Sequence, residues 1–157
     1  MSETEKLKQI VEEKFDYLKD AVKMQRERRL WAEVPYNKFF EVFDFLVKEH
    51  KFSFISTITG LDEGEYLAFI YHLSGQNGTL FNLKTKILKD KETIRTITNY
   101  FPSAAIYERE LEDLLGVKVD NLPKGIHYPL PDDWPQGEYP LRKNWDASVL
   151  DKGENKE

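Results

Sequence analysis

The sequence predicts an α+β fold in which helices pack on a small sheet of three to four antiparallel or mixed strands, followed by an extended arm rich in proline and aromatic residues. Apolar residues recur at helical spacing near the N-terminus, β-branched and aromatic runs occupy the middle, and prolines interrupt the last third. The 157 residues suit one sizeable core. We expect a compact domain over 1–117, a docking arm over 118–149 and a flexible tail over 150–157.

Two helices are predicted in the first third of the chain. A short strand, "RLWAEVP", separates them, and the second helix covers about 36–49. Phe45 points away from the apolar face of that helix, so we expect it to pack on a neighbouring element. The first helix is predicted from one apolar stripe with steps of three and four residues, formed by Leu7, Ile10, Val11, Phe15, Leu18 and Val22.

Three strands are predicted next. "KFSFISTITG" is rich in β-branched and aromatic residues and is expected to stop at Gly60. "EYLAFIYHLSG" is almost continuously apolar, which predicts a central strand covered on both faces. "TLFNLKTKILKD" alternates between apolar and polar residues, as a half-exposed strand does. "KETIRTITNYF" is interpreted as a short helix or an irregular link.

Composition excludes several classes of protein. Acidic residues outnumber basic ones 28 to 23, and the net charge of -5 argues against nucleic acid as the main partner. The chain has no cysteine, which excludes disulfides, thiol catalysis and cysteine-ligated iron–sulfur clusters or zinc. No signal core or bilayer-spanning run is present. We therefore expect a cytosolic protein, or one that is attached to a membrane through partners.

The stretch "IYERELEDLLGV" (106–117) concentrates four carboxylates around one arginine. It is predicted to lie on a helix that begins at Pro102-Ser103 and ends at Gly116. At about 100° per residue, Glu108 and Glu110 flank the apolar stripe and Ile106 lies among the outward charges. Arg109 and Asp113 also face outward and are placed to pair. The stripe expected to face the core consists of Ala104, Tyr107, Leu111, Leu114 and Leu115.

Four interpretations of these carboxylates remain open from the residues alone. Glu110 and Asp113 could serve a hydrolase, although an acid/base pair must converge on a cleft. A metal site would need a histidine near them, and the three histidines are scattered. A solvated helix face is the simplest interpretation. Ile106 among the charges favours the fourth, a surface that another protein covers.

The predicted arm carries a second cluster. "PLPDDWPQGEYPLRKNW" places Trp134, Tyr139 and Trp145 beside Arg142 and Lys143. Aromatic residues with arginine are typical of interface anchors. The arm could pack on its own sheet, dock on a partner, or do both. A stand-alone module that binds short peptides is a further alternative.

Both clusters resemble the 30 kDa subunit family of respiratory complex I and its relatives, which include membrane-bound, energy-converting [NiFe] hydrogenases. "TGLDEGEYLAFIYHLSG" is also similar to a turn and strand of this family. Two positions, Asn121 and Leu122, depart from the glycine and histidine usual there, and little chain follows Trp145. These departures favour the hydrogenase-type branch, or a related ferredoxin-linked respiratory complex, over a quinone-reducing NADH enzyme. The matching positions are Glu108, Arg109, Glu110, Asp113, Leu114 and Gly116, then Asp133, Trp134, Tyr139, Pro140, Leu141, Arg142 and Lys143.

The resemblance implies a non-catalytic subunit that binds no cofactor itself. Its partners would be a large catalytic subunit and a small iron–sulfur subunit, which carry iron–sulfur clusters and, in hydrogenases, a [NiFe] centre. The complex would couple electron transfer to ion translocation, with this chain peripheral on the cytoplasmic side of the membrane. The residues expected at the subunit interface are Ile106, Glu108, Arg109, Glu110, Asp113, Trp134, Tyr139, Pro140, Leu141, Arg142, Lys143 and Trp145.

Overall fold

In a computed structural model, which describes residues 1–151, the chain has an α+β fold built on a mixed sheet of five strands. The strand order is β1-β2-β5-β4-β3, with β1 antiparallel and β5 parallel to β2. The predicted α+β class is confirmed, but the predicted sheet of three to four strands was too small, and the extended C-terminal arm stays a prediction.

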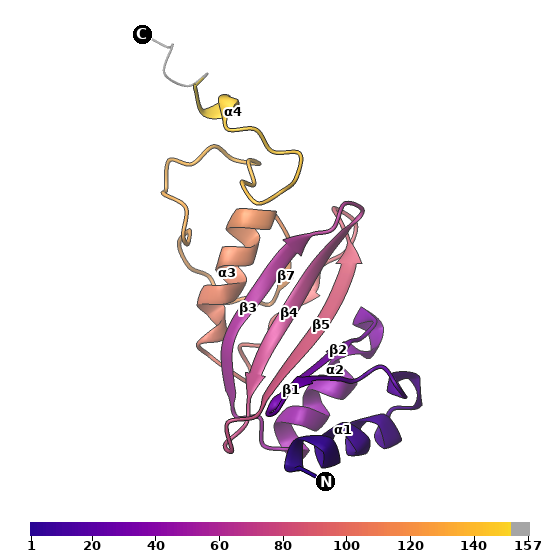
Figure 1. The fold of residues 1–157 in the computed structure, drawn as a ribbon. Helices are drawn as coiled ribbons and strands as arrows, with labels where there is room; N and C mark the ends of the chain where they lie inside the picture. The colour runs from indigo at the N-terminus through magenta and orange to yellow at the C-terminus, as the bar shows by residue number, and fades with distance from the viewer. Residues whose placement is uncertain (152–157) are drawn as a thin grey trace. The chain divides into compact units, whose positions relative to one another are not determined.

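The elements are placed along the chain as follows (Figure 1). The sheet contains β1 (Lys23–Arg26), β2 (Arg29–Glu33), β3 (Phe54–Asp62), β4 (Tyr66–Ser74) and β5 (Leu80–Leu88). Two short parallel strands, β6 (Ile94–Arg95) and β7 (Val119–Asp120), form a second sheet. The helices are α1 (Glu3–Lys14), α2 (Tyr36–Asp44), α3 (Ala104–Leu115) and α4 (Ser148–Asp151).

The chain divides into two compact units. Unit 1 contains residues 1–59 and 68–86, and unit 2 contains residues 60–67 and the chain from Ile87 onward. The strands β3, β4 and β5 contribute residues to both. The domain boundary expected after residue 117 stays a prediction. The tail expected over 150–157 starts within α4 and otherwise lies outside the described residues.

Helix α1 is shorter than predicted. A capping box begins it, in which Ser2 and Glu5 exchange side-chain and backbone hydrogen bonds. The helix ends at Lys14 because Phe15 is extended, with φ of -124°. A 3-10 turn over Asp16–Leu18 then buries Leu18. The single stripe through Ile10 was therefore wrong: Ile10 is 41% exposed.

The second predicted helix changes character halfway. It is α-helical as far as Asp44 and continues as a π-helical turn over Phe45–Glu49. The wider turn rotates Phe45 into the interior, where its ring meets that of Phe15 edge-on at 5.3 Å. The expectation that Phe45 packs on a neighbouring element is confirmed.

Three strand predictions needed correction. β1 was missed because all four of its side chains are exposed and show no apolar alternation. β3 was expected to stop at Gly60 but continues to Asp62. The "KETIRTITNYF" segment, interpreted as a short helix or an irregular link, is mostly irregular and not helical, but it contains the short strand β6, which pairs with β7.

Candidate functional site

Helix α3 ends at Gly116, as predicted. This residue has φ of +68°, in the left-handed region, and its N–H bonds the carbonyl of Glu112 at 3.0 Å. The ring of Tyr139 lies directly on it, and a Cβ at this position would come within 2.3 Å of that ring. Gly116 is therefore required both by the helix end and by the segment that packs over it.

The buried face of α3 differs from the predicted one. Its buried residues are Ala104, Glu108, Leu111 and Leu115, whereas Tyr107 is only half-buried. Leu111 and Leu115 approach Gly60 so closely that a Cβ there would lie 2.5 and 2.4 Å from their methyl groups. This close packing keeps the helix next to Gly60 and turns Glu108 inward.

Glu108, expected to flank the apolar stripe, is completely buried. Its carboxylate accepts hydrogen bonds from the Thr96 hydroxyl at 2.5 Å and from the Ile97 N–H at 2.7 Å. Burial raises the pKa of Glu108, and these two donors offset part of that rise. The geometry gives Glu108 a role within unit 2, where it fixes the chain around β6 to α3.

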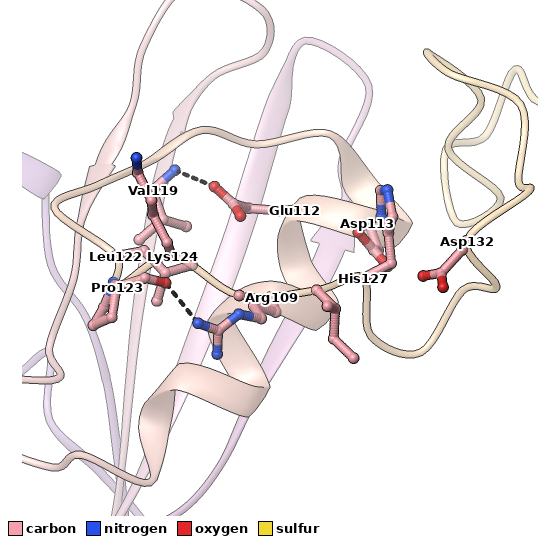
Figure 2. A pocket seen from close by; sticks show the side chains of 11 residues that line it. Arg109, Glu112, Asp113, Val119, Leu122, Pro123, Lys124, His127 and Asp132 are labelled. Atoms are coloured by element: carbon pink, nitrogen blue, oxygen red, sulfur yellow. Dashed lines mark hydrogen bonds and ion pairs between the residues drawn. The ribbon is translucent and has the colours of Figure 1, made fainter.

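Arg109 holds a loop over the outer side of α3 (Figure 2). Its Nη2 donates to the carbonyl of Pro123 at 2.5 Å. Gly125 passes over the same guanidinium, and a Cβ there would lie 2.3 Å from Nε. The pairing expected between Arg109 and Asp113 is replaced by these contacts with the loop.

Asp113 holds the same loop at a second point. Its two carboxylate oxygens accept from Nδ1 of His127 at 2.9 Å and from the N–H of Leu130 at 3.3 Å. The hydrogen bond to Asp113 and its negative charge raise the pKa of His127. Asp113 therefore holds both the His127 imidazole and the Leu130 backbone N–H, so each of its two carboxylate oxygens already accepts a hydrogen bond.

A groove of about 500 Å³ lies between α3 and this loop. Glu112 borders it and accepts from the N–H of Val119 at 3.2 Å, while burial raises the pKa of Glu112. Acidic, basic and apolar side chains share the groove, so no single charge dominates it. Its lining consists of Arg109, Glu112, Asp113, Val119, Leu122, Pro123, Lys124, Gly125, Ile126, His127 and Asp132.

Arg142 fastens the following segment to the end of α3. Its Nε donates to the carbonyl of Leu115 at 2.7 Å, and its two terminal nitrogens bond Asp90 at 2.7 and 3.0 Å. The guanidinium also lies 4.9 Å from the centre of the Tyr139 ring. The hydrogen bonds from Arg142 lower the pKa of Asp90. Planar, bidentate contacts of this kind suit arginine and not lysine.

Trp134 and Trp145 both donate a hydrogen bond to Glu138, which lies between them in the sequence. Trp134 donates to the backbone carbonyl of Glu138 and Trp145 to its carboxylate, both at 2.8 Å. The rings lie 5.9 Å apart. Their polar atoms are therefore satisfied within the segment.

The predicted interface residues separate into three groups. The side chains of several make hydrogen bonds inside unit 2, those of some others are half-buried, and those of the rest are open to solvent. Their assignment to a subunit interface stays a prediction. The first group is Glu108, Arg109, Asp113, Trp134, Arg142 and Trp145; the second includes Glu110, Tyr139 and Pro140; the third is Ile106, Leu141 and Lys143.

Sequence reasoning missed an anchor at Asp62. Its carboxylate accepts from the Lys89 ammonium and the Gly64 N–H, and also from the N–H of Lys143, 81 residues further along. The sequence pattern assigns Asp62 to a turn. The similarity of this turn to one in the family was the one available signal that Asp62 matters. It carried no information about the distant contact with Lys143.

Acid is expected to weaken this anchor. Burial opposes ionisation, but the bonds from Lys89, Lys143 and Gly64 hold the pKa of Asp62 at about 2, below its ordinary 3.8. Its contribution to stability is therefore complete above pH 4 and is lost as pH falls through 2. At about 1.4 kcal/mol per pKa unit, with allowance for solvent screening, this contribution is about 2 kcal/mol. Unfolding in urea at pH 4, 3 and 2 should show a smaller loss in Asp62→Asn than in the wild type; equal losses would contradict the assignment.

The described part of the chain lacks two features that would suggest other kinds of site. Residues 1–151 contain no group of three histidine or carboxylate side chains placed to hold a metal ion. The same residues contain no helix both long and apolar enough to cross a membrane.

Comparison with known proteins identifies relatives over most of the chain. Residues 32–149 match the family "Respiratory-chain NADH dehydrogenase, 30 Kd subunit". One subunit of the F(420)H(2) dehydrogenase of Methanosarcina mazei is 30% identical over 122 residues, covering 76% of this chain and 77% of that protein. The beta subunit of the membrane-bound hydrogenase of Pyrococcus furiosus is 25% identical over 148 residues, covering 90% and 86%.

A solved structure agrees with these matches. A chain of the membrane-bound sulfane sulfur reductase, described as an archaeal respiratory membrane complex, superposes with a TM-score of 0.80 and 30% identity. The match covers 98% of this chain and 92% of that one. The resemblance in the two motifs is thus confirmed by independent comparisons of sequence and of structure. The chain belongs to the 30 kDa subunit family of the respiratory-chain NADH dehydrogenase.

Proposed function

We propose that this chain is a non-catalytic, hydrophilic subunit of a membrane-bound, multisubunit oxidoreductase of the hydrogenase or complex I-like type. It braces the large catalytic subunit and the small iron–sulfur subunit on the cytoplasmic side of the membrane. In this way it supports electron transfer coupled to ion translocation. The names of relatives from hydrogenase, F(420)H(2) dehydrogenase and sulfur-reducing systems support a place in such a complex.

The observation that carries this proposal is a set of exposed apolar side chains, among them one on a loop that hydrogen bonds hold in place. Ile126 is 81% exposed, although bonds from Arg109 and Asp113 hold the loop on either side of it. Leu141 is 53% and Ile106 49% exposed. Apolar residues held rigidly in water bind a partner with little loss of conformational entropy. Exposed apolar residues held in place in this way are typical of a protein-binding surface.

The other interpretations have less support. A hydrolase would need free carboxylates that converge, and both oxygens of Asp113 are bonded to the loop. A stand-alone peptide-binding module would use the aromatic rings, whose indole N–H groups are satisfied internally. Membership of an NADH:quinone oxidoreductase remains the alternative within the family. We propose that the cofactors, iron–sulfur clusters and, in a hydrogenase, a [NiFe] centre, are held by the neighbouring subunits.

Aspartate at Ile126 and Leu141 is expected to detach the chain from its complex. Burying two new carboxylates in an apolar interface is strongly unfavourable, so partner subunits should be lost on affinity purification through a tagged chain. Ile10→Asp is the matched control, since Ile10 is 41% exposed but lies in unit 1. Full recovery of the large and small subunits with the double variant, given an unchanged circular dichroism spectrum, would refute the proposed surface.

A further inference from the structure

The hairpin formed by β1 and β2 carries a basic cluster that the proposed surface does not use. Residues 23–29 contain Lys23, Arg26, Arg28 and Arg29 but one acid, Glu27, in a chain whose net charge is -5. The hairpin belongs to unit 1, whereas the proposed surface belongs to unit 2. A positive site on an acidic chain requires a local explanation.

The arrangement of these arginines is unfavourable for the hairpin itself. Arg26 and Arg29 are direct partners across the two strands. Like charges in opposed positions destabilise a hairpin by up to about 1 kcal/mol. Arg28 has φ of +60°, a conformation that few residues other than glycine adopt readily. The hairpin is therefore not the arrangement that stability alone would favour.

Within the described chain, the arginines of the cluster are not held in ion pairs. Among residues 1–151, no carboxylate forms an ion pair with Arg26, Arg28 or Arg29. Glu27 accepts from the hydroxyl of Thr4 at 3.4 Å. The Nε atom of Arg29 is buried and lacks a hydrogen-bond partner in the described chain. The described chain therefore supplies no acceptor for this nitrogen, although buried donors are normally satisfied.

β1 also offers its backbone. It is the outer strand of the sheet, and all four of its side chains are exposed, with Met24 at 39%. An outer strand has N–H and C=O groups available to another extended chain. A peptide can use both the backbone edge and the guanidinium groups, whereas a lipid headgroup or a nucleic acid can use the charges alone.

We infer that the β1–β2 hairpin binds an extended, acidic segment of a partner subunit. Aspartate or glutamate side chains of that segment pair with Arg26 and Arg29 and separate their like charges, while its backbone runs along β1. Carboxylates fit guanidinium groups bidentately. This inference rests on the proposed function, because the partner is a subunit of the same complex, but it uses a different surface.

The test uses the complex, purified through a tagged chain and washed at increasing salt. Arg26→Gln/Arg29→Gln is expected to release one partner subunit at lower salt, with about tenfold weaker retention. The matched control, Lys6→Gln/Lys19→Gln, removes the same charge from exposed positions elsewhere in unit 1 and should behave as the wild type. Removing two opposed charges should not lower the stability of the isolated chain, so loss of retention cannot be attributed to unfolding.

A photo-reactive residue at Met24 identifies the occupant. Cross-linking within the complex should attach a peptide rich in aspartate and glutamate from a partner subunit. Salt-resistant retention of the arginine variant, together with no such peptide, would overturn the inference. So would binding of anionic lipid vesicles or RNA by the wild type that the variant loses while assembly is unchanged. If the hairpin variant assembles normally and the Ile126/Leu141 variant does not, the inference fails and the proposed function stands; the reverse result would leave the hairpin site standing and refute the unit 2 surface.

Discussion

Glu108→Ala is expected to lower the free energy of unfolding by about 3 kcal/mol. The substitution leaves the buried N–H of Ile97 and the hydroxyl of Thr96 without their shared acceptor, and it opens a cavity beneath α3. Urea unfolding at pH 7, followed by circular dichroism, measures this loss directly.

Glu108→Gln provides the control. Its carbonyl oxygen can still accept from Ile97, and its amide can donate to the Thr96 hydroxyl, so its stability should lie within about 1 kcal/mol of the wild type. Because burial raises the pKa of Glu108 above 4.5, wild-type stability falls as pH rises from 4.5 through the raised pKa, and the glutamine variant should lack this slope. Equal stability of the alanine variant and the wild type would show that Glu108 is not a structural anchor.

The second large effect is expected from Gly116→Ala. A left-handed alanine costs about 1 kcal/mol, and the new Cβ would lie 2.3 Å from the Tyr139 ring. The ring must move, and the stack of Tyr139 with Arg142 is lost with it. We expect a total loss of about 3 kcal/mol and faster amide hydrogen exchange over residues 139–145.

Gly137→Ala separates strain from overlap. Gly137 has φ of +83° and lies in the same segment, but no atom lies within 4 Å of its hypothetical Cβ. This variant should show the strain of about 1 kcal/mol alone. If both alanine variants lose equal stability, the packing of Tyr139 on Gly116 contributes nothing.

A structural feature could be predicted from the sequence where neighbouring residues alone give a recognisable pattern for it. The end of α3 at Gly116 was predictable because a left-handed glycine is a local requirement. β1 was not, because an exposed outer strand of charged residues lacks the apolar alternation by which strands are recognised.

The same contrast explains the candidate site. Helical geometry placed Ile106 outward, and the structure confirms its exposure at 49%. The same helical geometry predicted that Glu108 lies beside the core, whereas the structure buries it within the core. A helix rotates by a fraction of a turn to suit its packing, and the contacts with Gly60 that set this rotation lie about fifty residues away in the sequence. The bonds of Asp113 to its loop, and of Asp62 to Lys143, are equally remote from any local pattern.

The contacts that Arg142 and Lys143 make with earlier parts of the chain affect the order in which parts of the protein fold. Arg142 bonds Asp90, 52 residues earlier, and the N–H of Lys143 bonds Asp62, 81 residues earlier. Contacts over such separations close long loops and form late in folding. Synthesis also delivers residues 142 and 143 after all their partners. Leu141, adjacent to both contacts, is therefore presented only after these contacts have formed, so partner subunits would meet this surface in folded molecules and not in partly folded ones.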